Sequence, residues 1–126
     1  MAESEIYQIT SFQSTDTNIE ATVTFNKKHP VFAGHFSGNP IVPGVVQVQI
    51  IKNLMEKKTG KCLLLIHGKN IKFLTIISPA KNPKVEVRVE FGINEESLLP
   101  AQATIRAGDS TFMKFSGIYK PSTENK

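Results

Sequence analysis

The sequence has few features that would stabilise the chain by anything other than an ordinary hydrophobic core. It holds one cysteine, Cys62, which excludes an intrachain disulfide framework and is too few for a zinc finger. No apolar run approaches the roughly 20 residues that a helix needs to cross a bilayer. The acidic, polar start over residues 1–5 does not match a secretory signal. We therefore expect a cytoplasmic protein without membrane contact and without a metal or other cofactor.

The length of 126 residues is enough for one domain and too short for two of ordinary size. Hydrophobic residues make up 40% and charged residues 21% of the chain, a balance that argues against disorder. No internal repeat or linker divides the sequence. We expect a single domain over residues 1–126, with an ordered core over about residues 7–119.

The formal net charge is +4, which raises the question of nucleic-acid binding. The lysines are scattered as pairs and singles, with no basic block, no helix-turn-helix signature and no aromatic residues interleaved with arginine. These absences disfavour a nucleic-acid partner. The excess of positive charge suits an acidic protein partner, or serves only solubility.

Apolar periodicity predicts strands on both sides of one helix. Residues Ile19–Phe25 alternate between apolar and polar side chains, which is typical of a half-buried strand. Further strands are predicted after the helix, the last two joined by a two-residue turn at residues 108–109: Cys62–Ile66, Ile71–Ile77, Lys84–Phe91, Leu99–Ala107 and Thr111–Tyr119.

The single helix is predicted from Val45 to about Lys58. Pro43 and Gly44 suit its first turn, and Gly60 suits its end. One broad apolar face lies opposite a narrower polar stripe that contains Gln49, Lys52, Asn53 and Glu56. Because one long helix must bury its apolar face against the strands, the sequence predicts an α+β architecture.

The segment Gly34–Val45, GHFSGNPIVPGV, carries the most chemical information. His35 can take or release a proton near neutral pH. The first N–H groups of a helix that begins at Gly44 lack intrahelical partners and can hold a carbonyl oxygen that gains negative charge. The segment is therefore either a base beside an oxyanion donor, or a turn in which His35 satisfies a loop carbonyl.

This segment resembles the signature of the β-hydroxyacyl-acyl-carrier-protein dehydratases of fatty-acid synthesis. Their pattern is Gly-His-Phe-Pro-Gly-x-Pro-x-x-Pro-Gly-Val or Cys, and this chain departs from it only at Ser37. The stretch Ile71–Phe73 and the later Pro79 are also similar to the family, although residues 80 and 81 differ from its Pro-Gly-Asp turn. The resemblance implies the hot-dog fold, an antiparallel β-sheet wrapped around one long central helix.

The resemblance also implies roles for individual residues. His35 matches the family's catalytic histidine, and Gly44 matches the backbone donor to the thioester carbonyl. The family carries a Glu or Asp five residues after that glycine, supplied by the other subunit, where this chain has Gln49. The residues expected to line the substrate site are Phe36, Gly38, Pro43, Val45, Asn53 and Phe73.

Gln49 is the departure with the largest chemical consequence. A neutral amide can orient a hydroxyl group but cannot exchange a proton with it. Asn53 lies one turn further along the helix, so the two amides can bond one another. Glu56 lies about 10 Å further along the axis, too far to serve the same hydroxyl. The alternative interpretation is that Gln49 is an ordinary solvated polar residue without a role in the reaction.

Other chemical sites have weaker support in the sequence. His29, His67 and Cys62 do not have the spacing of a metal site. Cys62 opens an apolar run and is better explained as a small buried residue than as a nucleophile. Neither a dinucleotide-binding glycine motif nor a phosphate-binding loop is present.

Three functional hypotheses follow from these residues. The first is dehydration of 3-hydroxyacyl thioesters carried on acyl carrier protein, by a homodimer or dimer-based oligomer whose helix faces are too apolar to stay exposed. The second is a non-catalytic module that binds acyl groups or carrier protein. The third is a hot-dog thioesterase, for which no carboxylate is well placed. The length of the acyl chain cannot be deduced from the sequence.

Overall fold

The computed structural model describes residues 5–33 and 41–122. The elements follow the chain in this order: β1 (Tyr7–Ser14), β2 (Asn18–Phe25), the 3-10 helix η1 (Pro30–Ala33), α1 (Gly44–Thr59), β3 (Leu63–Phe73), β4 (Lys84–Phe91), β5 (Leu99–Ala107) and β6 (Ser110–Pro121).

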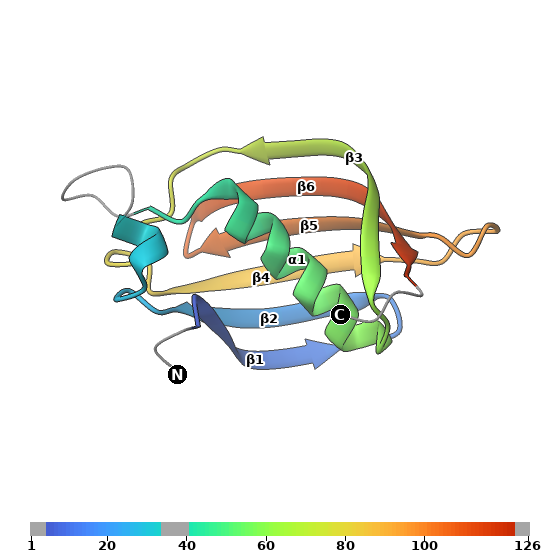
Figure 1. Cartoon of the computed structure of the whole chain (residues 1–126), viewed down its shortest axis with the longest axis horizontal. Coiled ribbons are helices and arrows are strands. Elements are labelled where there is room, and N and C mark those ends of the chain that lie inside the picture. Colours follow the sequence, from blue (N-terminus) through green and yellow to red (C-terminus); the bar gives the residue numbers. More distant parts are fainter. Residues whose placement is uncertain (1–4, 34–40, 123–126) are drawn as a thin grey trace.

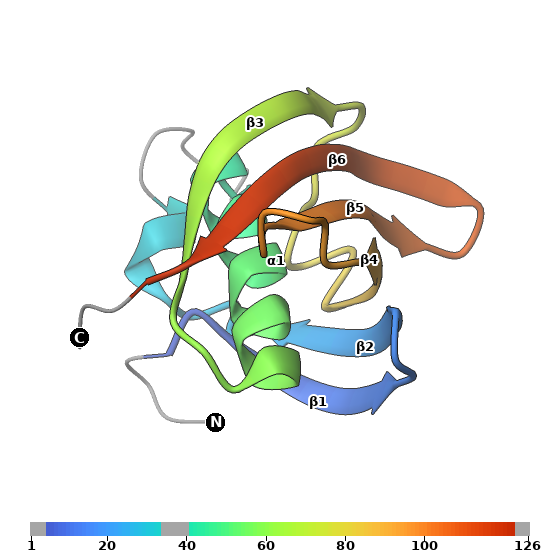
Figure 2. The same ribbon diagram turned by 90° about the vertical axis from the view of Figure 1, so that its right-hand side faces the viewer.

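The strands form one antiparallel sheet in the order β1-β2-β4-β5-β6-β3. Helix α1 lies across one face of this sheet (Figure 1), and the sheet curves around it when seen from the side (Figure 2). The predicted α+β class is confirmed, and so is the predicted arrangement of a sheet wrapped around a single long helix.

The core lies between the helix and the inner face of the sheet. From α1 it takes Ile50, Ile51, Leu54 and Met55, each with an exposed fraction of 0%. From the strands it takes alternate side chains, such as Val85, Val87 and Val89 on β4, as period-2 alternation requires. The apolar face of the helix is therefore covered by the chain's own sheet, as the sequence predicted.

The helix boundaries follow from its end residues. Pro43 occupies the N-cap position with extended backbone, and α1 begins at Gly44, one residue before the predicted start. Gly60 ends the helix with a positive φ of 70°, donating its N–H to the carbonyl of Glu56. This left-handed conformation suits glycine because it has no Cβ.

Two strands differ from the prediction. β1 was not predicted as a strand, because a register shift between Ile9 and Ser11 breaks the alternation on which the prediction relied. The predicted strands Cys62–Ile66 and Ile71–Ile77 form the single strand β3, which continues through His67 with two register shifts. The chain then leaves β3 at Phe73, so the end of the second predicted strand is a loop.

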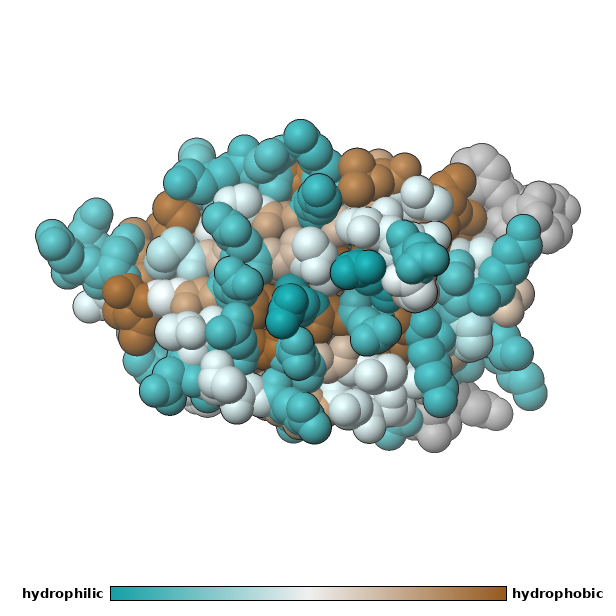
Figure 3. Space-filling view, turned by 180° about the vertical axis from the view of Figure 1, so that it is seen from behind, coloured by the Kyte–Doolittle hydropathy of each residue, from teal (hydrophilic) through white to brown (hydrophobic). Residues whose placement is uncertain are grey.

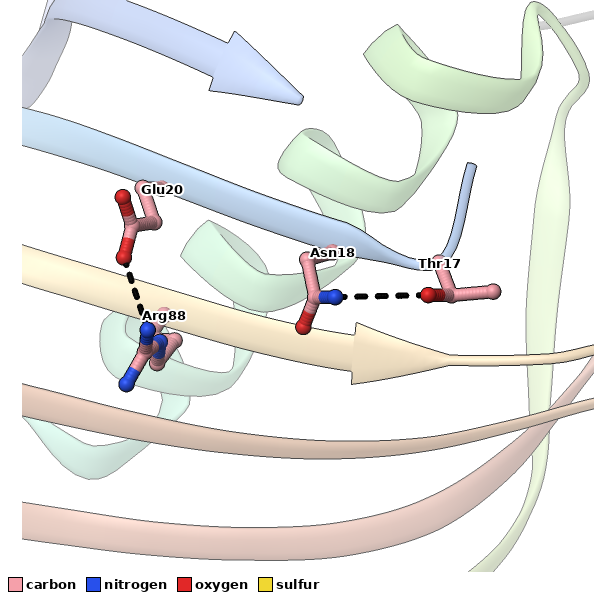
Figure 4. Close-up of polar contacts among 4 residues, drawn as sticks. All are labelled: Thr17, Asn18, Glu20 and Arg88. Carbon is pink, nitrogen blue, oxygen red and sulfur yellow. Dashed lines mark hydrogen bonds and ion pairs between the residues drawn. The ribbon is translucent and has the colours of Figure 1, made fainter. Parts of the chain in front are cut away.

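The outer face of the sheet is largely polar (Figure 3). On it, Arg88 of β4 and Glu20 of β2 are cross-strand partners and form an ion pair of 3.0 Å, and Asn18 donates a hydrogen bond to Thr17 nearby (Figure 4). Both charged side chains are more than half exposed, at 65% and 59%. Such a pair contributes little to stability, because water screens it and both side chains lose freedom.

Replacing Tyr119 by phenylalanine is expected to raise the free energy of unfolding by about 1 kcal/mol. The Tyr119 side chain is fully buried, and its hydroxyl has no hydrogen-bond partner among the described residues. A buried hydroxyl without a partner keeps its desolvation cost, which the substitution removes. Urea denaturation of both proteins measures the difference, and a loss of stability in the variant would contradict the prediction.

The same tyrosine should give an alkaline dependence of stability. Burial, and then the charge of Glu56, raise the pKa of Tyr119 above its usual value. The unfolded chain ionises first, at about pH 10, so this group leaves stability unchanged below that pH and lowers it as the pH rises further. Denaturation midpoints between pH 8 and 11 should fall less in Tyr119→Phe than in the wild type.

Candidate functional site

The start of α1 is held in place by backbone and side-chain bonds. The N–H of Val42 donates to the carbonyl of Ile77 at 2.9 Å, which ties the segment before the helix to the loop after β3. The Gln47 side chain in turn donates from Nε2 to the carbonyl of Val42 at 3.3 Å. The helix N-terminus therefore has a defined position at the end of the sheet where β3 finishes.

Two backbone donors are available at this helix end. The N–H groups of Val46 and Gln47 both donate to the carbonyl of Pro43, and Pro43 provides no side-chain cap. Within residues 5–33 and 41–122, the N–H groups of Gly44 and Val45 have no hydrogen-bond acceptor, so both are available to a ligand. They lie at the positive end of the helix dipole, which favours a carbonyl oxygen that gains negative charge.

The ring of Phe73 covers Gly44. A Cβ built at Gly44 would lie 2.8 Å from Cζ of Phe73, closer than Cβ atoms approach other atoms. Phe73 is half exposed, at 51%, and Val45 is largely exposed, at 76%. The structure thus brings together Gly44, Val45 and Phe73, three of the residues predicted for the site, from the helix start and the end of β3.

Gln49 and Asn53 form the predicted amide pair. Nε2 of Gln49 donates to Oδ1 of Asn53 at 2.8 Å, across one turn of the exposed side of α1. Gln49 is exposed and Asn53 is half buried. Both face the same side as Val45, which precedes Gln49 by one turn.

Tyr7 is hydrogen-bonded to this amide pair, and the sequence did not predict its place in the site. Nδ2 of Asn53 donates a hydrogen bond to the hydroxyl oxygen of Tyr7, on β1. Burial raises the pKa of Tyr7, and the hydrogen bond from Asn53 lowers it by less. Tyr7 is therefore a neutral phenol near pH 7. No local signal reveals this contact, because 46 residues separate Tyr7 from Asn53.

Gln47 is the second residue that the sequence reasoning missed. It is the one polar residue among the fully buried side chains of the described chain, with an exposed fraction of 3%. Its Oε1 has no hydrogen-bond partner among the described residues. Helical spacing could have predicted this burial, because Gln47 lies three residues before Ile50 and four before Ile51, on the apolar face.

Three of the predicted residues, His35, Phe36 and Gly38, lie outside the described residues. Their roles remain predictions from the sequence. The remaining predicted residues are all described. Pro43, Gly44, Val45 and Phe73 gather at the helix start, and Gln49 and Asn53 continue along the same exposed side of α1.

The other candidate residues have structural roles or none. Oε2 of Glu56 accepts the N–H of Leu63 at 2.8 Å, so this carboxylate joins the helix to the start of β3. His29 accepts the N–H of Val31 through Nδ1 at 3.0 Å, and His67 lies within β3. In the part of the chain that is described, no three His, Cys, Asp or Glu side chains gather as metal ligands.

A broad hollow of about 680 Å³ lies away from this site, on the outer face of the sheet. Polar and charged side chains line it, including Arg88, Arg106 and Lys114. None of the predicted site residues borders it. No described helix is long and apolar enough to cross a membrane.

The fold and the open helix start define the class of the protein. An antiparallel sheet around one central helix is the hot-dog fold, and solved structures of this kind align with nearly the whole chain. One is titled the dehydratase heterocomplex ApeI:P from Xenorhabdus doucetiae, with a TM-score of 0.65 and 15% identity over 89% of this chain and 96% of the other. Another is a thioesterase from Haemophilus influenzae, with a TM-score of 0.57 and 16% identity over 94% and 80%.

The sequence then assigns the family. Residues 11–100 match the ApeI-like family, described as ApeI dehydratase, and the chain belongs to that family. Curated relatives named 3-hydroxyacyl-(acyl-carrier-protein) dehydratase FabZ are similar to it. The Clostridium acetobutylicum protein is 34% identical over 53% of this chain and 51% of its own length. The Caulobacter vibrioides protein (strain NA1000 / CB15N) is 30% identical over 78% and 56%.

The match covers these relatives only in part. The chain spans about half the length of the curated relatives that it matches. The dehydratase-type family and the hot-dog fold are established for this chain.

Proposed function

We propose that this protein dehydrates 3-hydroxyacyl thioesters, carried on acyl carrier protein, to trans-2-enoyl thioesters. The observation that carries the proposal is the open start of α1, where the N–H groups of Gly44 and Val45 have no partner among the described residues. A thioester oxygen bound there would gain negative charge as the α proton leaves, and the two donors and the dipole would stabilise that charge.

In the proposed reaction, His35 carries the one proton that is transferred. The imidazole takes the proton from Cα, the electron pair of that C–H bond forms the double bond, and the bond from Cβ to oxygen breaks. The departing hydroxide then takes the proton back from the imidazolium and leaves as water. Gln49 orients the hydroxyl group without exchanging a proton, because an amide has no titratable group in this range.

Two protomers are part of the proposal, with Gln49 serving the site of the neighbouring subunit. The support is an exposed apolar surface along the free edge of the sheet, since β3 pairs only with β6 among the described strands. Its members lie on β3 and in the loop that follows it, and they are exposed by 44–65%: Leu64, Ile66, Phe73, Leu74 and Ile76. Apolar surface of this kind along an unpaired strand favours association with a second copy.

The reverse reaction provides the test of function. Purified protein is expected to hydrate a trans-2-enoyl thioester, seen as loss of the enoyl absorbance, and His35→Ala is expected to lower this rate by at least about 10²-fold. Wild-type protein with no hydration, but with saturable binding of acyl carrier protein, would contradict the enzyme and support the binding module. Release of free thiol without hydration would support the thioesterase instead.

Substituting Gly44 by alanine tests the approach to the helix N–H groups. The new Cβ would meet Cζ, at the far end of the half-exposed Phe73 side chain, so the free energy of unfolding should change by no more than about 1 kcal/mol. The rate of hydration should fall about 10- to 100-fold, because the substrate carbonyl is misplaced.

Gly92→Ala is the matched control, since a Cβ there meets no atom within 4 Å. It should keep both the stability and the rate. An unchanged rate in Gly44→Ala would argue against carbonyl binding at this helix end.

A further inference from the structure

We propose that Tyr7 is a positioning residue that acts through Asn53 and holds the Gln49 amide with its carbonyl oxygen free to accept the substrate's hydroxyl proton. The inference rests on the proposed function for the role of the hydroxyl group. It adds to that function a residue of β1 and a direction for the Gln49 amide.

Asn53 takes part in two hydrogen bonds of opposite direction. Asn53 has one accepting and one donating end, and the structure uses both. Its Oδ1 accepts from Nε2 of Gln49 at 2.8 Å, and its Nδ2 donates to the hydroxyl oxygen of Tyr7. Since an amide presents oxygen on one side and nitrogen on the other, the orientation of Asn53 determines which end of Gln49 faces it.

Within the described part of the chain, these two hydrogen bonds leave the carbonyl oxygen of Gln49 as the unbonded end of its amide. With Nε2 engaged by Asn53, Oε1 is the atom left without a hydrogen bond among the described residues. Gln49 lies on the exposed side of α1, so this oxygen is open to a ligand. An accepting oxygen at this position can bind a hydroxyl group much as a carboxylate oxygen would, although it cannot take the proton away.

Tyr7 is suited to hold this arrangement because it is fixed and neutral. It pairs with Phe25 of β2 in the sheet, so its backbone is anchored independently of the helix. Its ring is half buried, and its raised pKa keeps the hydroxyl protonated across the working pH range. The Tyr7 hydroxyl group thereby connects the amides of Asn53 and Gln49 on α1 to the sheet through hydrogen bonds.

Two variants separate this arrangement from its reverse. Tyr7→Phe removes the acceptor of Asn53 and keeps the ring, so the Gln49 amide loses its preferred direction. Asn53→Asp presents only accepting oxygens, so it still receives Nε2 of Gln49 and no longer needs Tyr7. In the reverse arrangement, with Asn53 donating to Oε1 of Gln49, aspartate would instead turn the Gln49 amide around.

Kinetics of enoyl thioester hydration measure the effect. Tyr7→Phe should lower kcat about 3- to 10-fold, the loss of one oriented hydrogen bond, with KM within twofold. The effect of Tyr7→Phe should disappear in an Asn53→Asp background, so the double variant Tyr7→Phe, Asn53→Asp should match Asn53→Asp, whatever rate that variant has. Unchanged kcat in Tyr7→Phe, or a further threefold or larger loss when Tyr7→Phe is added to Asn53→Asp, would overturn the proposal.

Tyr119→Phe is the matched control for the loss of a tyrosine hydroxyl. Its hydroxyl is buried on β6 and has no part in the site, so kcat and KM should equal those of the wild type. Thermal unfolding of each variant shows whether the protein remains folded under the assay conditions.

An NMR measurement separates this inference from the proposed function. The side-chain amide signal of Gln49, identified by its absence in Gln49→Glu, should show slow hydrogen exchange in wild type and Asn53→Asp and faster exchange in Tyr7→Phe. This pattern in a protein without hydratase activity would contradict the function and support the positioning by Tyr7. Equal exchange in all three proteins would overturn the positioning.

Discussion

Replacing Gln49 by glutamate is expected to raise the rate of 3-hydroxyacyl thioester dehydration about 10²- to 10⁴-fold at neutral pH. The resemblance to the family matches Gln49 to the family's acidic residue, and Gln49 is exposed on α1. A carboxyl group there adds proton exchange with the departing hydroxyl group, which the amide of Gln49 cannot provide.

The neighbouring residues can accept the new carboxylate. Asn53 would turn its Nδ2 toward residue 49, and Tyr7, which can both donate and accept, would donate its hydroxyl proton to Oδ1 of Asn53. A carboxylate at residue 49 can only accept and would impose this reversed direction, whereas with glutamine the two bonds run toward Tyr7 as the structure shows.

Gln49→Leu is the control, because it removes hydrogen bonding and keeps a side chain of similar size; its rate should fall below that of the wild type. Dehydration rates of the three proteins between pH 4 and 9 should show an additional ionisation in Gln49→Glu alone. If Gln49→Glu only equals the wild type while His35→Ala is inactive, the amide suffices and the acid is dispensable in this site.

Replacing Leu54 by alanine is expected to lower the free energy of unfolding by about 2–5 kcal/mol. Leu54 lies on the buried face of α1, with an exposed fraction of 0%. The substitution removes apolar contacts and leaves a cavity between the helix and the sheet, which a close-packed interior fills only in part.

Ile93→Ala is the matched control on the surface. It deletes a side chain of similar size that is 72% exposed, in the loop between β4 and β5, so its effect should stay within about 0.5 kcal/mol. Urea denaturation measures both variants. A cost below about 1 kcal/mol for Leu54→Ala would mean that the helix does not pack on the sheet as described.

Much of the fold could be predicted because its signals are local. The alternation over Lys84–Phe91 and Leu99–Ala107 gave both strands with their observed bounds, and Gly108 with residue 109 gave the turn between β5 and β6. Each depends on residues a few positions apart, where sterics and burial act directly on the sequence pattern. β1 escaped prediction because its register shift interrupts that pattern.

In the candidate site, too, features with a local signal could be predicted and contacts made only by folding could not. Gly44 could be predicted from its place at a helix start, and the bond between Gln49 and Asn53 from their spacing of one turn. Phe73 was predicted by resemblance to the family, but its position over Gly44 is a fact of the folded chain.

The sequence alone therefore determined the α+β class, the helix, most of the strands and the neutral residue where the family carries an acid. Only the tertiary structure decided that Tyr7 bonds Asn53 and that Phe73 covers Gly44. Local periodicity specifies which elements form. Contacts between residues far apart in the chain depend on how the strands pair and where the sheet curves around the helix.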